Sequence, residues 1–301
     1  MSSQNVASDD TRIDWVKSIP IFILWGVAVI GPFFTGLSWT SVAVAGFLYF
    51  VRMFFVTGFL HRYFSHRTFK TSQGFEIVMA TLSCTAVQKG ALWWAYTHRH
   101  HHATSDTVSD VHSTLHRASK WKGFWWAHVG WILCGKHHGI PSKSAPKDFA
   151  RNPVLLRFEN PLWYVTPPAI LGVLCYVLGV YLGPTWNTNG AQMVIVGFFL
   201  STFVLFNATS AINSLAHSFG SVRYNSGDQS KNSFLLALIT LGEGWHNNHH
   251  YRQIKANQAE TKFELCFDWT YWILWALHCC RIIEIPKEQS HLTPRPATGL
   301  V

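Results

Sequence analysis

Four apolar segments, each about as long as a lipid bilayer is thick, constrain this chain more than any other feature. They cover residues 19–37, 40–60, 162–182 and 193–212, and a helix needs about 20 apolar residues to cross the hydrocarbon core. Arg52 is the one charged residue inside them, and charged residues make up 13% of the chain, about half of what a soluble domain carries. We therefore expect an all-α integral membrane protein that forms one domain over residues 1–301.

The charges between the apolar segments predict how the helices are oriented. The links near Ser38 and at residues 183–192 carry no charge, whereas all 24 lysines and arginines except Arg52 fall on the other side of the spans. Because positively charged loops stay in the cytoplasm, we expect two helical hairpins that enter the membrane from the cytoplasmic side. Residues 61–161 and 213–301 would form a cytoplasmic helical cap that also holds both termini.

Shorter apolar stretches at 75–87, 121–134 and 267–280 are expected to be buried or interfacial helices. The net charge of +9 lies between apolar segments rather than on one soluble face, so no nucleic-acid partner is expected. The six cysteines include no C-x-x-C pair, and neither a disulfide framework nor a thiolate metal site is predicted.

Seventeen histidines cluster beside the predicted helix ends. His61 and His66 form H-x-x-x-x-H after the second span, and H-x-x-H-H occurs at 98–102 and at 246–250. Positions i, i+3 and i+4 share a helix face, so each H-x-x-H-H is expected to present three imidazoles toward one point. His61 and His66 would diverge by about 140° on an ideal α-helix, so they should bind different metals or lie across a helix end.

The histidine clusters are too large for one ion, which takes four to six ligands. Two metal ions are therefore implied, and imidazole suits iron, copper, zinc and nickel. Asn213 and His217 share a face after the fourth span in the same way. The remaining histidines, among them His100, His112 and His291, are interpreted as surface groups or as groups that support the ligands.

Four sequence strings, taken in order, point to a known family. H-R-Y-F-S-H (61–66), H-R-H-H-H (98–102), N-S-L-A-H (213–217) and G-E-G-W-H-N-N-H-H (242–250) resemble the histidine boxes of membrane fatty-acyl desaturases of the stearoyl-CoA desaturase type. The strings at 123–131 and 207–209 also fit, and the similarity runs from about Tyr49 to Tyr251. Their order and their spacing from the spans are more specific than any single box.

The resemblance implies an oxygen-dependent desaturase that introduces a cis double bond, by family default at Δ9, into a saturated fatty acyl chain. It implies two iron ions, which zinc could replace in overproduced protein, and an Asn213 that acts through a water. The implied iron ligands are His61, His66, His98, His101, His102, His217, His246, His249 and His250.

The resemblance also implies a narrow acyl tunnel with a bend lined by Gln88, Trp94 and Thr209. Its closed end would lie on the second span, where Tyr49 and Met53 share a face. Animal stearoyl-type enzymes have a small residue where Met53 stands, so a sixteen-carbon chain is expected to be preferred over an eighteen-carbon chain. Arg52 is expected to point away from the tunnel, toward a carbonyl or the protein interior.

Two positions depart from the animal acyl-CoA enzymes, in which an Arg-Asp pair before the second box helps to hold the CoA headgroup. Tyr96 and Thr97 stand there, and a later basic pair is reduced to Gly135-Lys136. The acyl carrier therefore stays open between CoA, a lipid and a carrier protein.

An unactivated methylene has no acidic proton, so its oxidation requires cofactor chemistry. The chain has no dinucleotide-binding G-x-G-x-x-G after a strand and no haem-attaching C-x-x-C-H. A separate ferredoxin or small haem protein, with its reductase, is expected to deliver electrons at the basic cytoplasmic face. The alternatives are a membrane hydroxylase of a lipid or alkane, and a metal-transport protein, whose ligands would lie near the bilayer midplane.

Overall fold

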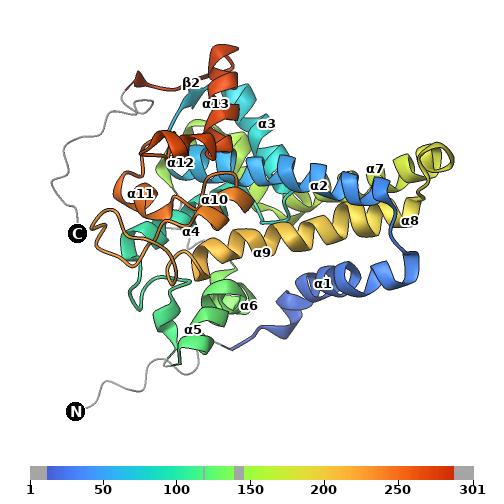
Figure 1. Cartoon of the computed structure of the whole chain (residues 1–301), viewed down its shortest axis with the longest axis horizontal. Helices are drawn as coiled ribbons and strands as arrows, with labels where there is room; N and C mark the ends of the chain where they lie inside the picture. Colours follow the sequence, from blue (N-terminus) through green and yellow to red (C-terminus); the bar gives the residue numbers. More distant parts are fainter. Residues whose placement is uncertain (1–11, 118, 139–145, 288–301) are drawn as a thin grey trace.

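The computed structural model describes residues 12–117, 119–138 and 146–287, and these residues are mostly helical. Long helices extend to one side of the molecule, and short helices gather at the other end (Figure 1). One small antiparallel sheet, β1 (Lys70–Thr71) with β2 (Ile283–Glu284), joins the two cap segments. The predicted all-α architecture is confirmed.

Four helical stretches are long and apolar enough to span a membrane. The first is α1 (Trp15–Thr35), and the third is α7 (Pro161–Trp186). The second consists of α2 (Trp39–Phe54) and the π-helix η1 (Phe55–Ser65). The fourth consists of α8 (Gly190–Gln192), the π-helix η8 (Met193–Leu200) and α9 (Ser201–Ser214). All four predicted spans are confirmed, with ends shifted by several residues, so that Lys17 and Arg62 lie inside helix ends.

The spans form the two predicted hairpins, with tight turns at the end opposite the cap (Figure 1). Gly36, with φ of +68°, ends α1, and its amide donates to the carbonyl of Pro32. A left-handed Asn187 ends α7 in the same way. The hydroxyl of Ser38 lies 3.0 Å from that of Thr188, so the two turns contact each other. α1, α2 and α7 all pack against η8.

Short helices from two separate segments make up the cap. Between spans two and three lie α3 (Gln73–Cys84), α4 (Ala91–Thr104), η2 (Thr114–His116), α5 (Lys120–Trp125), η3 (Trp126–Gly130), α6 (Trp131–Leu133), η4 (Gly135–His137), η6 (Lys147–Arg151) and η7 (Pro153–Glu159). After span four come α10 (Phe234–Ile239), α11 (His246–Tyr251), α12 (Lys262–Cys266) and α13 (Trp269–Cys279). The three shorter apolar stretches are thus helical, as predicted.

The largest core cluster joins the cap to the second span. It buries Leu60 and Phe64 of η1 against Met79 of α3 and Leu274 of α13. α4 also packs against η1. Because η1 and α4 both carry histidine boxes, this packing holds those boxes together at the boundary between spans and cap.

Candidate metal centre

Nine buried or half-buried histidines form two groups, and in each group the ligating nitrogens lie within 4.8 Å of one another. The first group is His61, His66, His98, His102 and His249. The second group is His101, His217, His246 and His250. These are the nine histidines that the resemblance implied as ligands, and they come from η1, α4, α11 and the end of span four.

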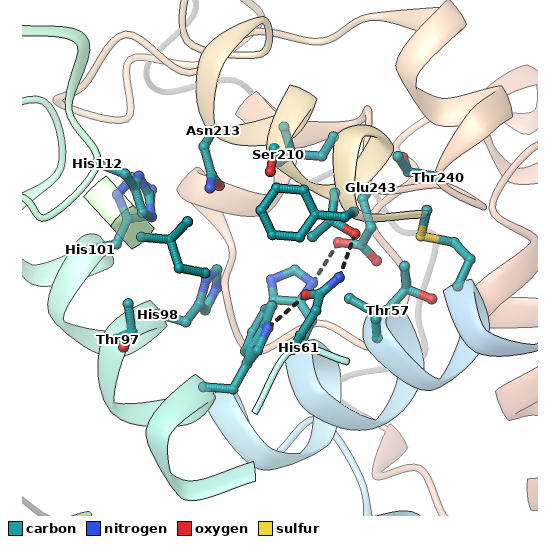
Figure 2. Close-up of a pocket in the computed structure, with 18 of the residues that line it drawn as sticks. Thr57, His61, Thr97, His98, His101, His112, Ser210, Asn213, Thr240 and Glu243 are labelled. Carbon is teal, nitrogen blue, oxygen red and sulfur yellow. Dashed lines mark hydrogen bonds and ion pairs between the residues drawn. The ribbon is translucent and has the colours of Figure 1, made fainter. Parts of the chain in front are cut away.

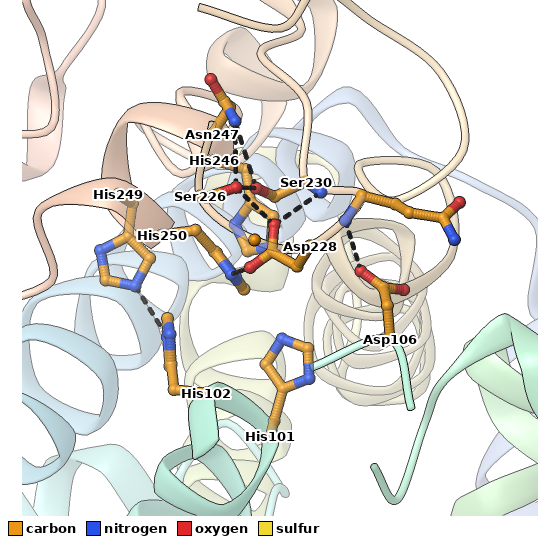
Figure 3. Close-up of polar contacts among 12 residues, drawn as sticks. His101, His102, Asp106, Ser226, Asp228, Ser230, His246, Asn247, His249 and His250 are labelled. Atoms are coloured by element: carbon orange, nitrogen blue, oxygen red, sulfur yellow. Dashed lines mark hydrogen bonds and ion pairs between the residues drawn. The ribbon is translucent and has the colours of Figure 1, made fainter. Parts of the chain in front are cut away.

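Each H-x-x-H-H box divides between the two groups, so the expectation that it points toward one site was wrong. On α4, His98 and His102 belong to the first group and His101 belongs to the second. On α11, His249 belongs to the first group, whereas His246 and His250 belong to the second. Residues four apart differ by about 40° around an α-helix, whereas residues three apart differ by about 60° in the opposite direction. The i+3 histidine is therefore directed to the neighbouring group. Figure 3 shows His102 beside His249, its neighbour in the first group, whereas His101 lies apart from both.

His61 and His66 share one group, which their spacing on an α-helix did not allow. The helix is of the π type here, and the amide of His66 donates to the carbonyl of His61, five residues earlier. A π-helix brings residues five apart close together, and His66 caps its end. Of the two predicted alternatives, binding to different metals was wrong, and a position across a helix end is confirmed.

The ring nitrogens of the first group converge more closely than single hydrogen bonds between the rings would require. Nε2 of His66 lies 2.8 Å from Nε2 of His98, which lies 2.9 Å from Nε2 of His102. Nε2 of His249 lies 3.0 Å from those of His61 and His102. A neutral imidazole carries one N–H, and Nε2 of His98 and Nε2 of His249 each lie close to two other rings, so a single hydrogen would have to serve two acceptors at once. A cation among them could accept a lone pair from each ring, and the arrangement therefore fits a metal ion.

Four carboxylates that the sequence analysis did not single out hold the outer nitrogens of four of these rings. Nδ1 of His61 donates to Glu243 at 2.5 Å, and Nδ1 of His101 to Asp110 at 3.0 Å. Nδ1 of His217 donates to Asp106 at 2.8 Å, and Nδ1 of His250 to Asp228 at 2.6 Å. Such bonds fix the tautomer and leave Nε2 free to bind a metal. Nε2 of His250 indeed has no hydrogen-bond partner in the described structure.

Glu243 is buried next to His61, and the residue before it, Gly242, has a positive φ. Gly242 has φ of +118°, a conformation that favours glycine, and a Cβ there would lie 2.5 Å from Oδ1 of Asp268. Arg62 donates to both Glu243 and Asp268. The G-E-G string of the last box therefore places a carboxylate behind His61 and pairs it with a buried cation.

Burial shifts the protonation equilibria toward metal binding. It holds the pKa values of the imidazoles of His66, His98 and His249 well below 6.5 and lowers that of His250 to about 4, although Asp228 opposes the shift. Burial alone would raise the pKa of the Glu243 carboxyl, but His61 and Arg62 lower it to about 2. Neutral imidazoles paired with ionised carboxylates are the protonation states that a metal centre requires.

His112, interpreted from sequence as a surface or supporting group, is buried beside the second group. Its ring centroid lies 4.2 Å from that of His101, and these two residues form a third potential ligand cluster with Asp110. The amide of His112 donates to the same carboxylate. His112 thus supports the turn that orients His101, whereas His291 lies outside the described residues.

An apolar cavity runs from the second span to both histidine groups (Figure 2). Its lining includes Met53, Val56, Gln88, Trp93, Trp94, Thr97, His98, His101, His112, Trp131, Phe206, Thr209, Asn213 and His246. Asn213 points into it (Figure 2). Met53 is 1% exposed and does not face lipid. Tyr49, one turn away, instead donates its hydroxyl hydrogen to the carbonyl of Ile239.

The three residues assigned to the tunnel bend form one hydrogen-bonded chain across this cavity. The indole of Trp94 donates to the carboxamide oxygen of Gln88 at 3.2 Å, and the carboxamide nitrogen of Gln88 donates to the hydroxyl of Thr209 at 3.0 Å. They come from α4, from the loop before it and from α9. This polar bridge lies next to His98, whose ring centroid is 5.0 Å from that of Trp94.

A four-span helical bundle that carries two histidine groups beside an apolar cavity defines a multi-pass membrane protein with a candidate metal centre. Residues 37–254 match the family described as fatty acid desaturase. The sn-1 stearoyl-lipid 9-desaturase of Anabaena variabilis is 32% identical over 87% of this chain and 90% of its own length. The sn-2 palmitoyl-lipid 9-desaturase of Nostoc sp. (strain 36) is 28% identical over 95% and 94%. The acyl-CoA Delta(11) desaturase of Spodoptera littoralis is 31% identical over 92% and 82%.

The chain belongs to the fatty acid desaturase family and is an oxidoreductase of lipid metabolism. The resemblance stated from the histidine boxes is confirmed. A metal transporter would place its ligands near the middle of the spans, whereas both histidine groups lie where the spans meet the cap.

Proposed function

We propose that this chain is an oxygen-dependent di-iron desaturase that introduces a cis double bond at Δ9 of a saturated fatty acyl chain. One observation carries the proposal: His98, His101 and His246, drawn from both histidine groups, line the same cavity as the Gln88 bridge. An acyl chain in that cavity would pass both groups at the point where it must bend. A bent chain is predisposed to a cis product.

The two groups would each hold one iron through imidazole nitrogens, with no carboxylate directly on the metal. Histidine is a suitable ligand for iron, and zinc binds the same donors. Asn213, which lines the cavity, would act through a water. When bound, the irons supply, together with oxygen, the oxidising power needed to remove hydrogen from an unactivated methylene.

The protein's own residues bind and orient the substrate. Met53 and Val56 line the part of the cavity formed by the second span, and Phe206 lines the part formed by α9. Fixing a methylene beside the reactive centre reduces the entropic barrier, and apolar walls exclude water. Gln88, Trp94 and Thr209 would set which carbons stand next to the histidines.

The acyl carrier is proposed to be a membrane lipid or CoA. Relatives of both kinds are similar to this chain over more than nine-tenths of its length. Thr97, at one of the two positions where animal acyl-CoA enzymes have their Arg-Asp pair, lines the cavity. A carrier bound next to Thr97 would leave its acyl chain directed toward the histidine groups.

The proposed active site faces the cytoplasm, because the lysines and arginines lie on the cap side. Each double bond formed with reduction of oxygen to water needs two electrons from outside. A separate ferredoxin or small haem protein, with its reductase, would supply them at the basic cap surface.

Mass spectrometry with double-bond mapping, on lipids from cells that express the chain, tests the proposal. The expected product has lost two hydrogens at Δ9, and a product that has gained an oxygen atom would show a hydroxylase instead. A His98→Ala variant, which removes one proposed ligand, should yield no product. Purified enzyme assayed with acyl-CoA and with acyl-lipid vesicles would identify the carrier.

A further inference from the structure

Arg52 carries a full charge in the middle of a membrane span, and its side chain is 1% exposed. Its Nε donates to the carbonyl of Leu48 at 3.0 Å, and Nη1 donates to the hydroxyl of Thr202 at 2.6 Å. Nη2 donates to the hydroxyl of Ser201, and Nη1 also reaches the carbonyl of Thr85 at 3.2 Å. The prediction that Arg52 faces a carbonyl in the protein interior is confirmed.

The partners of this buried cation are all neutral. None of the ion pairs formed by the described residues includes Arg52, and the guanidinium lies 5.4 Å from the centroid of the Phe198 ring. A charge within a span is costly, and apolar side chains can join helices without that cost. Arg52 joins the second and fourth spans through Thr202 and Ser201, and its bond to the Thr85 carbonyl also reaches a residue outside the spans.

Thr85 begins a strained loop. Val87 and Lys89 have φ of +59° and +64°, a region unfavourable for residues with a Cβ and most unfavourable for a β-branched one. Such conformations persist only where the surroundings impose them.

The far end of the loop is also held. Nζ of Lys89 donates to the carbonyl of His138 at 3.0 Å and lies over the ring of Trp93. A Cβ on Gly90 would lie 2.2 Å from the carbonyl oxygen of Phe158. Arg52 therefore holds the start of this loop, and Lys89 and Gly90 hold its end.

Gln88 lies between the two strained residues, and its carboxamide forms the bridge to Thr209 and Trp94. The bridge lines the cavity beside His98, whose ring centroid is 5.0 Å from that of Trp94. A shift of the loop would therefore move the bend relative to the histidine groups, without changing any metal ligand.

We propose that Arg52 is a positioning residue that sets where the double bond is introduced. Through the Thr85 carbonyl it holds the 85–90 loop, and thereby Gln88, so that one pair of methylenes faces the metal centre. This inference rests on the proposed function and deepens it, since it assigns positional selectivity to a residue that touches neither substrate nor metal.

The test is the positional distribution of product double bonds from Arg52→Met, which keeps an unbranched apolar stem but removes the guanidinium and every donor. Wild-type enzyme should give one dominant position. Arg52→Met should give neighbouring positions as well, with roughly a tenfold loss of positional discrimination, because the one charged hydrogen bond that holds the loop, to the Thr85 carbonyl, is among those lost. Metal content per chain should stay the same, which separates this effect from damage to the metal centre.

Ser38→Ala is the matched control, because it removes a hydroxyl contact between the two hairpins at the opposite end of the spans. It should leave the position unchanged even if the melting temperature falls. Thr202→Val removes a hydroxyl that accepts a hydrogen bond from the Arg52 guanidinium, and Lys89→Met removes the hydrogen bond that holds the end of the loop. These two variants replace Arg52→Met in the test if Arg52→Met does not accumulate in membranes.

A lower yield with the same single position in these variants would overturn the role of Arg52, because a merely structural tether changes the amount of active enzyme and not its selectivity. Wild-type protein that forms no double bond under any assay condition would instead overturn the proposed function.

Discussion

At the scale of single residues, the candidate centre is built from pairs. Each of four histidines donates its Nδ1 hydrogen to a carboxylate, and the four carboxylates come from loops or turns outside the helices. The carboxylate orients the ring and increases the basicity of the nitrogen that faces inward. These pairs predict effects of residues that would not bind metal themselves.

Replacing Asp228 with Asn should weaken metal binding by about 10- to 100-fold, the usual effect of losing such a support. The amide cannot accept the Nδ1 hydrogen of His250 as strongly as the carboxylate does at 2.6 Å. Elemental analysis after dialysis against a weak chelator measures the effect. Glu260→Gln, whose carboxylate pairs with Arg252 and Lys255 instead, should retain its metal. Equal retention in both variants would contradict the supporting role of Asp228.

Met53→Ala should shift substrate preference from a sixteen-carbon toward an eighteen-carbon chain. Met53 lines the cavity on the second span, and each methylene that finds room gains about 0.8 kcal/mol of burial. Competition between the two substrates, for wild type and variant, measures the shift. An unchanged product ratio would remove Met53 from the closed end of the tunnel.

The metal-free protein should lose stability as pH falls below about 6.5. The unfolded chain takes up histidine protons there, whereas burial keeps the folded pKa of His250 at about 4 and holds those of His98 and His249 well below 6.5. The unfolded state then binds more protons than the folded state, so the free energy of unfolding decreases as the pH falls. Melting temperatures of metal-stripped and iron-loaded protein at about pH 7.5 and pH 5 measure this. The melting temperature of the iron-loaded protein should fall less, because metal stabilises the neutral imidazoles. A metal-free protein with the same melting temperature at both pH values would refute this prediction.

At the scale of secondary-structure elements, the local backbone decides which histidines meet. The last box depends on Gly242, whose φ is +118°, and on Gly244, where a Cβ would lie 2.0 Å from the amide nitrogen of Ala237. These glycines let the chain between α10 and α11 pass close to its neighbours and carry Glu243 inward.

Gly242→Ala should therefore destabilise the protein by about 2 kcal/mol or more, from the left-handed backbone and the clash with Asp268. It should also lower the metal content, since Glu243 supports His61. Gly74→Ala in α3, where a Cβ meets no atom within 4 Å, should be neutral or slightly stabilising. Thermal unfolding in detergent compares the two, and similar melting temperatures would contradict the strain at Gly242.

Much of this architecture could be predicted, because length and hydropathy identify spans and because histidines are rare enough to stand out. The ligand set followed from four boxes in order. The pairing of His61 with His66 could not be predicted, because α-helical spacing was assumed where the helix is of the π type. The division of each H-x-x-H-H box was within reach, since the angular difference between i+3 and i+4 is a property of any helix.

The supporting carboxylates carried a weaker signal. Asp106, Asp110 and Asp228 lie in polar loops with no fixed spacing to a box, and only the folded chain brings them to the rings. Glu243 could more easily have been identified from the sequence, because it lies inside the last box between two glycines. The role of Arg52 in holding Thr85 depended on a contact between residues 33 apart, which no local pattern encodes.

At the scale of the whole molecule, both hairpins direct their turns away from the cap, and both histidine groups lie at the cap end (Figure 1). With the lysines and arginines on the cap side, the positive-inside rule predicts that the cap lies in the cytoplasm. The two termini, which lie outside the described residues, are expected on the same side.

A reporter that is active only in the cytoplasm should therefore be active when it is fused after Val301. A reporter that is active only outside the cytoplasm should be inactive at the same position. A second fusion within the turn at residues 187–189 should give the opposite result. Activity of the Val301 fusion only outside the cytoplasm would refute this topology.

The shortness of the two turns has a consequence for how the enzyme is made. In the proposed orientation, residues 36–38 and 187–189 are the connections that cross the bilayer during biosynthesis. They are uncharged, so insertion moves little polar surface through the hydrocarbon. In that orientation the histidine boxes would never leave the compartment in which the ribosome works. A metal cofactor would then be loaded from the cytoplasm while the cap folds, with no need to export metal across the membrane.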